Sequence, residues 1–278
     1  MINRRKFLET ATSGAISAWA LTKTRPITRL ETIGVQLYTV RDDMDKDFEG
    51  TLQKVASLGY KQVEFAGYYN RTPEQVKEIL NRFGLEAPSA HIPLKVIQEN
   101  FEQSIEAAKI IGHKLLVCPY LDANDRKTID NYKSHAATFN KAGESCKKAG
   151  IEFAYHNHDF ELAAIDGTVP LDFLLAETDK NLVKLELDLY WMKKANANSL
   201  AYLAKHPKRI IAFHVKDMDN TPKMYFTEVG RGIINFKEIF AQGKNTGVKF
   251  YFVEQDQCPG SPIDSLKISI EYLKQLEF

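Results

Sequence analysis

Short apolar runs alternate with amphipathic stretches along most of the chain. From Leu30 onward, runs rich in β-branched and aromatic residues recur, and each is followed by a stretch with helical spacing of apolar positions. The runs predict strands at residues 33–40, 61–67, 86–92, 114–119, 151–157, 183–190, 210–217 and 248–255. The stretches between them predict helices at 47–58, 73–83, 98–111, 131–149, 170–178, 198–206, 235–242 and 262–276. Glycines stand where four of these helices should end, at Gly59, Gly84, Gly112 and Gly150.

Eight alternating strand–helix units predict an α/β fold. Their number and order match a single (β/α)₈ TIM barrel, which needs about 250 residues. A doubly wound open sheet is the alternative, but the first strand–helix turn, TVRDDM, lacks the glycine pattern of a dinucleotide site. No linker rich in Pro, Gly or Ser interrupts the chain. We therefore expect one barrel domain over residues 30–278.

The first twenty residues have the pattern of a cleavable export signal. NRRKFL resembles the twin-arginine motif, a mildly apolar stretch follows, and Ala18-Trp19-Ala20 fits an A-x-A cleavage site. We expect cleavage after Ala20 and export to the periplasm by the twin-arginine route. The alternative is a basic N-terminal helix that is never processed, which the acidic Glu9 favours. The apolar stretch is too short to span a bilayer stably.

The charge of the chain argues against nucleic-acid binding, and its cysteines argue against a disulfide framework or a cysteine metal site. The chain has 37 basic and 36 acidic side chains, and removing residues 1–20 changes its formal charge from +1 to −1. Proteins that bind nucleic acid usually show a strong basic excess or stripe, so DNA and RNA are not expected partners. The three cysteines, Cys118, Cys146 and Cys258, are too few and too widely spaced for a disulfide framework or a CxxC metal site.

Alternation along the strands predicts which side chains point into the barrel, whose C-terminal face is the usual place of the active site. In the last four strands the apolar phase should face the helices: Ile151, Phe153, Tyr155, Leu185, Leu187, Leu189, Ile211, Phe213, Val215, Tyr251 and Val253. The inward phase then carries Glu152, His156, His158, Glu186, Asp188, Tyr190, His214, Lys216 and Glu254.

Ionisable groups buried together need compensation, since an unpaired one costs several kcal/mol. One divalent metal ion held by four side chains at matching heights would supply it: His156, Asp188, His214 and Glu254. Their mixed nitrogen and oxygen donors suit Mn, Co, Zn, Mg or Fe rather than Ca. Each residue alone is more often an ordinary hydrogen-bonded group, but the four in phase favour a metal. For Glu64 and His91, on strands two and three, substrate contact and structural hydrogen bonding both stay open.

Seven segments follow one another in a fixed order: GVQLYTVRDDM, GYKQVEFAGYY, YHNHDFE, LELDLYW, FHVKDMD, EVGRGIINF and FVEQD. Together they resemble the sugar phosphate isomerase/epimerase family, the xylose isomerase-like barrels, over nearly the whole chain from Ile33. The resemblance implies a divalent metal at the strand ends and a ketose or related α-hydroxy carbonyl substrate. It also implies Asp188, His214 and Glu254 as metal ligands, and Lys216 and Arg231 as groups that hold substrate oxygens.

The fifth strand departs from the family pattern. Many epimerases of this group carry a glutamate ligand there, which faces the eighth-strand glutamate across the substrate. Here the position is His156, although a shift of one residue would make it Tyr155 and bring in His158. The hypothesis of epimerisation with a base on each face of the substrate is therefore weakened. His158 or Glu161 could replace the missing base.

The resemblance and the expected metal together predict proton transfer next to a carbonyl. Two substrate oxygens would chelate the ion, which stabilises an enediolate, with Glu254, His158 or Glu161 as general base. We expect an isomerase or epimerase of a keto-sugar. A metal-dependent lyase or hydratase of a keto-sugar, such as a 3-keto-glycoside, is the alternative, and a non-catalytic sugar-binding barrel is an alternative of another class. Export favours an unphosphorylated carbohydrate as substrate, and assembly as a homo-oligomer stays open.

Overall fold

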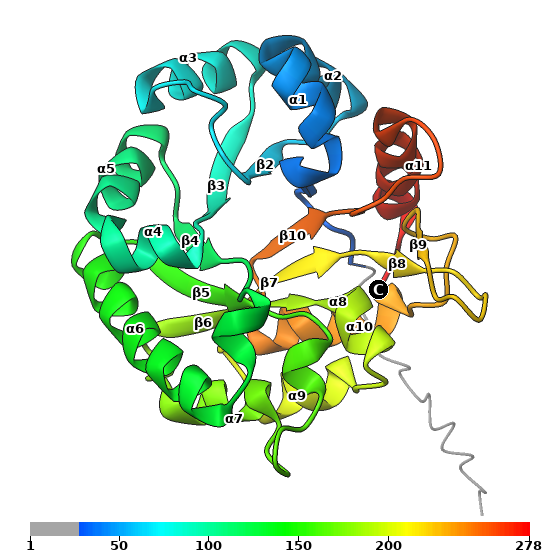
Figure 1. The fold of residues 1–278 in the computed structure, drawn as a ribbon. Helices are drawn as coiled ribbons and strands as arrows, with labels where there is room; N and C mark the ends of the chain where they lie inside the picture. Colours follow the sequence, from blue (N-terminus) through cyan, green and yellow to red (C-terminus); the bar gives the residue numbers. More distant parts are fainter. Residues whose placement is uncertain (1–27) are drawn as a thin grey trace, which may run out of the picture.

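The computed structural model describes residues 28–278; the predicted export signal lies outside the described residues. Within that range, eight parallel strands close into a barrel in the order β1-β10-β7-β6-β5-β4-β3-β2, which confirms the predicted TIM barrel (Figure 1). The strands are β1 Gly34–Gln36, β2 Gln62–Phe65, β3 Glu86–His91, β4 Leu115–Cys118, β5 Glu152–His156, β6 Val183–Asp188, β7 Ile210–Val215 and β10 Phe250–Val253.

Helices surround the barrel on its outside (Figure 1). They are α1 Arg41–Lys46, α2 Phe48–Leu58, α3 Pro73–Phe83, α4 Leu94–Glu99, α5 Phe101–Ile111, α6 Ile129–Lys148, α7 Pro170–Glu177, α8 Leu189–Lys194, α9 Ser199–Lys205, α10 Phe236–Thr246 and α11 Pro262–Gln275. Every predicted helix is present, and the predicted helix 98–111 is divided at Asn100 into α4 and α5. The four predicted stops are confirmed, since each of those glycines has a positive φ just after its helix.

Several predicted strands are too long at their C-terminal ends, because polar side chains start a helical turn there. The side chain of Gln36 accepts a hydrogen bond from the backbone N of Tyr38, and a 3₁₀ turn, Leu37–Val40, replaces the second half of the first predicted strand. Asp188 likewise accepts from the backbone N of Trp191 at 2.9 Å and caps α8. Leu189 and Tyr190 therefore belong to a helix, and the inward direction predicted for Tyr190 along a strand is wrong.

The predicted inward and outward phases hold for most strand residues. Phe153, Leu187 and Tyr251 belong to the large apolar core between strands and helices. A small separate cluster fills the barrel itself: Leu115, Val117, Ala154, Ile211, Ala212 and Phe252. The prediction that Ile211 faces outward is therefore wrong. The register between β6 and β7 shifts at this point: Leu185 pairs with Ile210, but the next residue, Glu186, pairs with Ala212, so Ile211 has no partner on β6.

A two-stranded hairpin follows β7 and shapes one side of the barrel mouth. Its strands, β8 Asp217–Met218 and β9 Phe226–Thr227, are antiparallel. The buried carboxylate of Asp217 accepts hydrogen bonds from the backbone N of Gly230, Gly232 and Ile234 at 2.9–3.1 Å. A Cβ at Gly232 would lie 2.2 Å from Asp217 Oδ1, so only glycine fits. This one carboxylate thus fixes the path of the EVGRG segment.

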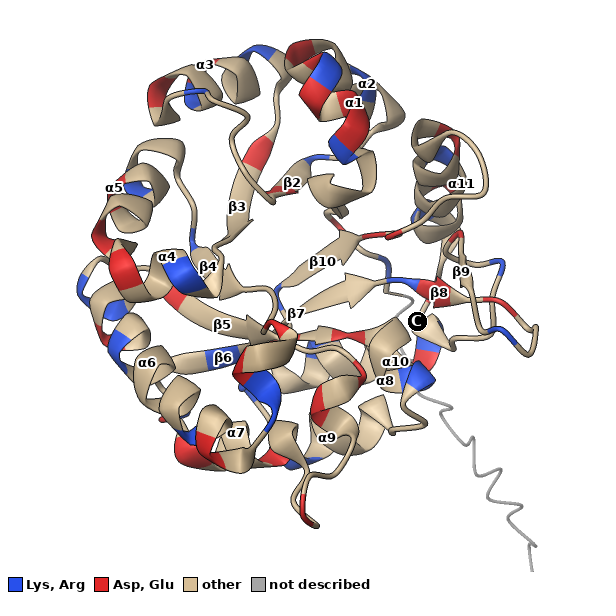
Figure 2. Cartoon of the chain, in the orientation of Figure 1, with Lys and Arg blue, Asp and Glu red and all other residues tan. Residues whose placement is uncertain are grey.

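Charged side chains of both signs are spread over the outer helices, with no basic stripe on the face that Figure 2 shows. Among the helices of the described range, none has the length and apolar character needed to cross a membrane.

Candidate metal centre

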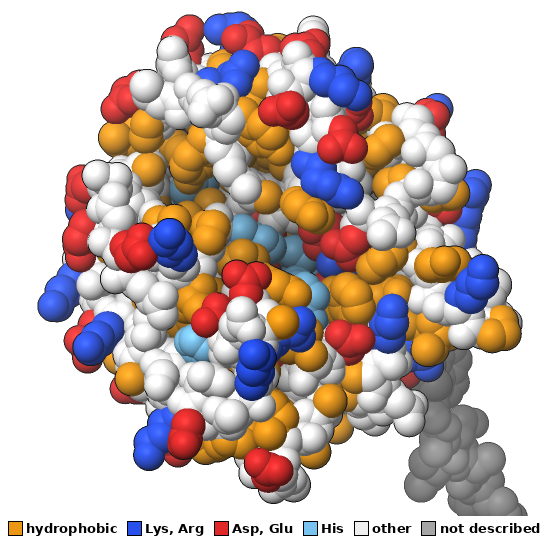
Figure 3. Space-filling view, in the orientation of Figure 1, with side chains coloured by type: hydrophobic (Ala, Val, Ile, Leu, Met, Phe, Trp, Pro, Cys, Tyr) orange, Lys and Arg blue, Asp and Glu red, His pale blue; other side chains and the backbone are white. Residues whose placement is uncertain are grey.

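Six strands aim ionisable side chains at the C-terminal mouth of the barrel. Glu64 is the last inward-pointing residue of β2, and His91 and His156 are the last residues of β3 and β5. The remaining groups come from β6, β7 and the residue after β10: Glu186, Asp188, His214 and Glu254. Apart from His91, which is part-buried, all are almost fully buried. A space-filling view shows histidine and carboxylate atoms at the bottom of the central hollow (Figure 3).

Among the residues that the structure describes, two overlapping groups of side chains are close enough to bind a cation. Asp188, His214 and Glu254, the strand-end group, have ligand atoms within 4.8 Å of one another. His214 Nδ1 lies 2.7 Å from Glu254 Oε2 and 3.9 Å from Asp188 Oδ2. The predicted fourth ligand, His156, places Nε2 3.7 Å from the same Asp188 oxygen. The structure therefore brings the four predicted ligands together.

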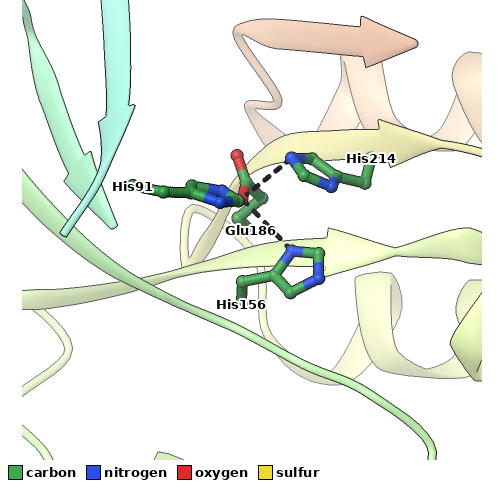
Figure 4. Close-up of side chains that lie close together, drawn as sticks. All are labelled: His91, His156, Glu186 and His214. Carbon is green, nitrogen blue, oxygen red and sulfur yellow. Dashed lines mark hydrogen bonds and ion pairs between the residues drawn. The ribbon is translucent and has the colours of Figure 1, made fainter. Parts of the chain in front are cut away.

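The second group, the inner group, consists of His91, His156, Glu186 and His214 (Figure 4). It lies deeper because Glu186 precedes Asp188 by one alternation of β6. Glu186 Oε2 lies 2.9 Å from His91 Nε2, 3.1 Å from His214 Nε2 and 3.2 Å from His156 Nδ1. Glu64 closes the bottom, with Oε2 2.7 Å from His214 Nε2 and 2.8 Å from the side-chain nitrogen of Gln36.

The ammonium of Lys216 lies among three carboxylates. Its Nζ is 2.7 Å from Glu254 Oε2, 3.0 Å from Asp188 Oδ2 and 3.0 Å from Asp256 Oδ2. Burial lowers the pKa of Lys216, but these three negative charges outweigh it and hold the pKa well above its ordinary value. Lys216 is therefore a buried ammonium.

Atoms without a well-formed hydrogen bond in both groups fit a bound cation. Glu186 Oε1 is buried and has no such partner among the described residues. Asp188 Oδ2 and His214 Nδ1 are also buried without a well-formed hydrogen bond, although each lies beside an ion-pair partner, Lys216 and Glu254 respectively. Burial raises the pKa of Asp188 to about 6, and the charge of Lys216 opposes this only in part. Burial and the charge of Glu64 also raise the pKa of Glu186, but His214 and His156 bring it down to about 2. The donor set of imidazole nitrogens and carboxylate oxygens suits zinc, manganese, cobalt or iron.

A cavity of about 380 Å³ opens above these groups. Its walls are formed by Tyr38, Ala66, His91, Pro93, Pro119, Tyr120, His156, His158, Lys216, Glu254 and Asp256. Its size suits a small molecule, and its lining combines six histidine, lysine and acidic side chains with apolar and aromatic ones. A small polar substrate bound here would contact the candidate ligands directly.

The family model described as xylose isomerase-like TIM barrel matches residues 52–276. The chain belongs to this family. An inosose dehydratase from Clostridium perfringens is 25% identical, over 84% of this chain and 93% of its own length. A sugar phosphate isomerase/epimerase from Parabacteroides distasonis, of known structure, is 28% identical with a TM-score of 0.78, over 88% of this chain and 98% of that one.

The IOLI protein, solved with a bound zinc atom, shares the fold, with a TM-score of 0.69 and 15% identity over 86% of this chain and 95% of that one. Membership of the xylose isomerase-like family and the two relatives above confirm that the protein is an enzyme, of isomerase, epimerase or lyase type.

His158, one of the predicted bases, lies at the mouth of this xylose isomerase-like barrel. Its ring packs on Phe160, with centroids 5.3 Å apart, and contacts Tyr120 and Trp191 at 5.1 and 5.2 Å. Burial lowers its pKa well below the ordinary value, and the charge of Lys216 lowers it further. His158 is thus a neutral imidazole in the cavity wall.

Two other predicted site residues do not reach the cavity. The carboxylate of Glu161 accepts hydrogen bonds from the hydroxyl of Tyr155, on the outward phase of β5, and from the backbone N of His158 at 2.7 Å. Glu161 therefore supports the loop behind His158, and its position does not favour a role as base. The side chain of Arg231 is 59% exposed and lies 3.6 Å from Glu228, away from the residues that line the cavity.

Sequence reasoning left three important side chains unassigned. Alternation placed Glu186 inside the barrel, but nothing in the pattern shows that three histidines meet it. Asp256, a partner of Lys216, lies past the end of β10, where alternation no longer applies. Gln36 contacts Glu64 across β1 and β2, and only the spacing of the two strand ends could have indicated that pair.

Proposed function

We propose that the protein is a divalent-metal-dependent lyase that removes the proton next to the carbonyl of a keto-sugar or a related polyhydroxylated ketone and expels a β-substituent such as water. The observation that carries this proposal is the one-sided placement of the base. Glu254 is the one carboxylate among the candidate ligands that lines the cavity, and the fifth-strand position that would face it in a two-base epimerase holds His156 instead of a glutamate. Epimerisation needs a proton-transferring group on each face, whereas elimination can proceed with one base.

A divalent cation held by His156, Asp188, His214 and Glu254 would place positive charge beside the carbonyl oxygen and so acidify the neighbouring C–H. Glu254 is the carboxylate that takes this proton. Lys216 is the acid that protonates the departing hydroxyl group, which leaves as water. Because Lys216 Nζ lies 2.7 Å from Glu254 Oε2, the proton on Glu254 can return to the lysine and restore both groups.

The substrate that fits best carries no phosphate. Among the residues that line the cavity, Lys216 is the one lysine or arginine, and three carboxylates already surround it. No lining cation is left to bind a dianion. The dehydratase from Clostridium perfringens acts, by its name, on an inosose, which is a polyhydroxylated ketone without phosphate. Inososes and free keto-sugars are therefore the first substrates to test.

Isomerisation is the second candidate, favoured by the 28% identical isomerase/epimerase. Both reactions begin with the same proton loss, so deuterium exchange tests the shared step. Metal-loaded protein would be incubated in D₂O with inososes and keto-sugars and followed by NMR. We expect deuterium at the carbon next to the carbonyl, then an unsaturated or deoxy product, with both signals lost after chelation. A rearranged sugar would identify an isomerase, and sugar binding without exchange would identify a non-catalytic barrel.

A further inference from the structure

Glu186 lies at the centre of the inner group and has no role in the reaction proposed above. One of its oxygens, Oε2, faces ring nitrogens of His91, His156 and His214 at 2.9–3.2 Å (Figure 4). The three histidines come from β3, β5 and β7, and Glu186 comes from β6. A single buried carboxylate oxygen therefore connects imidazoles from three other strands.

Two of these imidazoles face both groups at once. His214 has Nδ1 2.7 Å from Glu254 Oε2 in the strand-end group, and Nε2 3.1 Å from Glu186 Oε2 in the inner group. His156 has Nε2 3.7 Å from Asp188 Oδ2 and Nδ1 3.2 Å from Glu186 Oε2. Each ring thus has one nitrogen toward the proposed cation and the other toward Glu186.

The tautomer of each ring decides whether it can bind the cation. A neutral imidazole has one lone pair and one N–H. If the lone pair faces the strand-end group, the N–H must face inward, where it needs an acceptor, because a buried N–H without one is costly. Glu186 Oε2 is that acceptor for His156, and it shares the role with Glu64 for His214.

We propose that Glu186 is a positioning residue for the metal centre, which holds His156 and His214 in the tautomers that present their lone pairs to the cation. This inference rests on the proposed function, since it takes the ion to be bound by the strand-end group and His156. If one ion were bound in each group, His156 and His214 would each have to bind an ion through both ring nitrogens, and so lose both N–H protons. One ion with Glu186 as hydrogen-bond acceptor avoids that requirement.

Cobalt titration of metal-free protein tests the role of Glu186 without reference to turnover. We expect the wild type and Glu186→Gln each to bind one Co²⁺, with a Kd about 10–100-fold higher in the variant. The visible spectrum of the bound cobalt should also change, because the histidine ligands are held differently. Glu186→Asp keeps the negative charge but moves the carboxylate away from the histidines, so its Kd for Co²⁺ should be intermediate. This variant also tests the inference if Glu186→Gln does not fold.

Glu228→Gln is the matched control. Glu228 is another buried carboxylate, which accepts a hydrogen bond from the Ser265 hydroxyl at 2.8 Å and belongs to neither group. It should bind cobalt as the wild type does. An unchanged Kd and spectrum in both Glu186 variants would overturn the inference. Two cobalt ions in the wild type and one in Glu186→Gln would also overturn it, because Glu186 would then be a ligand itself.

Asp188→Asn separates this inference from the proposed function. If Asp188→Asn binds little cobalt while Glu186→Gln binds it like the wild type, the strand-end centre stands and only the role of Glu186 is wrong. If the wild type binds no cobalt, or Asp188→Asn binds it equally well, the proposed function fails and the inference fails with it.

Discussion

Two histidines separated by one residue, His156 and His158, have different surroundings and should do different work. His156 lies against Asp188, Glu186 and the ring of His214, whereas His158 is packed among aromatic rings at the mouth. A ring that gives its lone pair to a cation cannot also accept a substrate proton with it. We therefore expect position along one strand end to separate the candidate metal ligand, His156, from His158, which lines the cavity.

His158→Ala should keep the metal and lose activity, by about 10²–10⁴-fold if the ring takes part in proton transfer. His156→Ala should lose both, because it removes a ligand. Elemental analysis and turnover of both variants, side by side, check this assignment. The reverse pattern, with metal retained in His156→Ala and absent from His158→Ala, would exchange the two roles.

Glu161 should make stability depend on pH. Burial raises the pKa of its carboxyl group to about 7 from an ordinary value of 4.5. A raised pKa means that the folded state favours the protonated form, so this contribution is complete below about pH 4.5 and is lost as the pH rises through 7. The difference of about 2.5 units corresponds to about 3 kcal/mol.

Glu161→Gln should remove this dependence, since an amide can donate to the Tyr155 oxygen and accept from the backbone N of His158 at any pH. Urea unfolding at pH 5 and pH 8 would measure it as the difference in unfolding free energy between variant and wild type. We expect that difference to favour the variant by about 2–3 kcal/mol more at pH 8 than at pH 5. Equal differences at the two pH values would contradict the raised pKa.

At the level of elements, the sequence predicted the strand–helix order well because most strands have an apolar outward phase and because α2, α3, α5 and α6 are each followed closely by a glycine. It predicted the four candidate ligands because alternation reaches the strand ends. It failed at Tyr190, where a capping aspartate ends the strand inside an apolar run, and at Ile211, where neighbouring strands change register. Neither local capping geometry nor interstrand register is visible in hydrophobic periodicity.

The segment after β9 depends on Asp217, so Asp217→Asn should loosen it. Asparagine offers one acceptor oxygen where the carboxylate accepts four backbone N–H groups, including that of Met218. We expect the unfolding free energy to fall by about 2–4 kcal/mol, since buried donors lose their partners. Trypsin should also cut faster after the exposed Arg231, and the added substitution Arg231→Gln should abolish that cut. Unchanged cleavage would show that other contacts hold the segment.

On the scale of the whole molecule, a cation bound by several strands should stabilise the barrel, because it binds the folded state only. At a free metal concentration 100 times Kd the gain is about 2.7 kcal/mol. For a chain of this size, that corresponds to a rise in Tm of roughly 5–10 °C. Differential scanning calorimetry after chelation and after adding back Zn²⁺ or Mn²⁺ measures it. Equal Tm values with and without metal would argue against a site spanning β5, β6 and β7.

Export also concerns the whole chain and stays a prediction from the NRRKFL motif and the A-x-A pattern. Arg4→Lys together with Arg5→Lys should leave the precursor in the cytoplasm, whereas the wild type should yield a periplasmic form that begins at Leu21. Cell fractionation and N-terminal sequencing would show both. An undiminished periplasmic yield from the double variant would rule out the twin-arginine route.

The order of strands around the barrel divides the site between the two halves of the chain. All four candidate ligands come from β5 onward, whereas β1 to β3 supply Gln36, Glu64, Ser89 and His91, which contact those ligands or one another, and much of the cavity wall. In evolutionary terms, the second half can conserve the metal chemistry while the first half diverges. Exchange of the N-terminal half-barrel between relatives is accordingly a route by which this fold could acquire new substrates while the four candidate ligands stay in place.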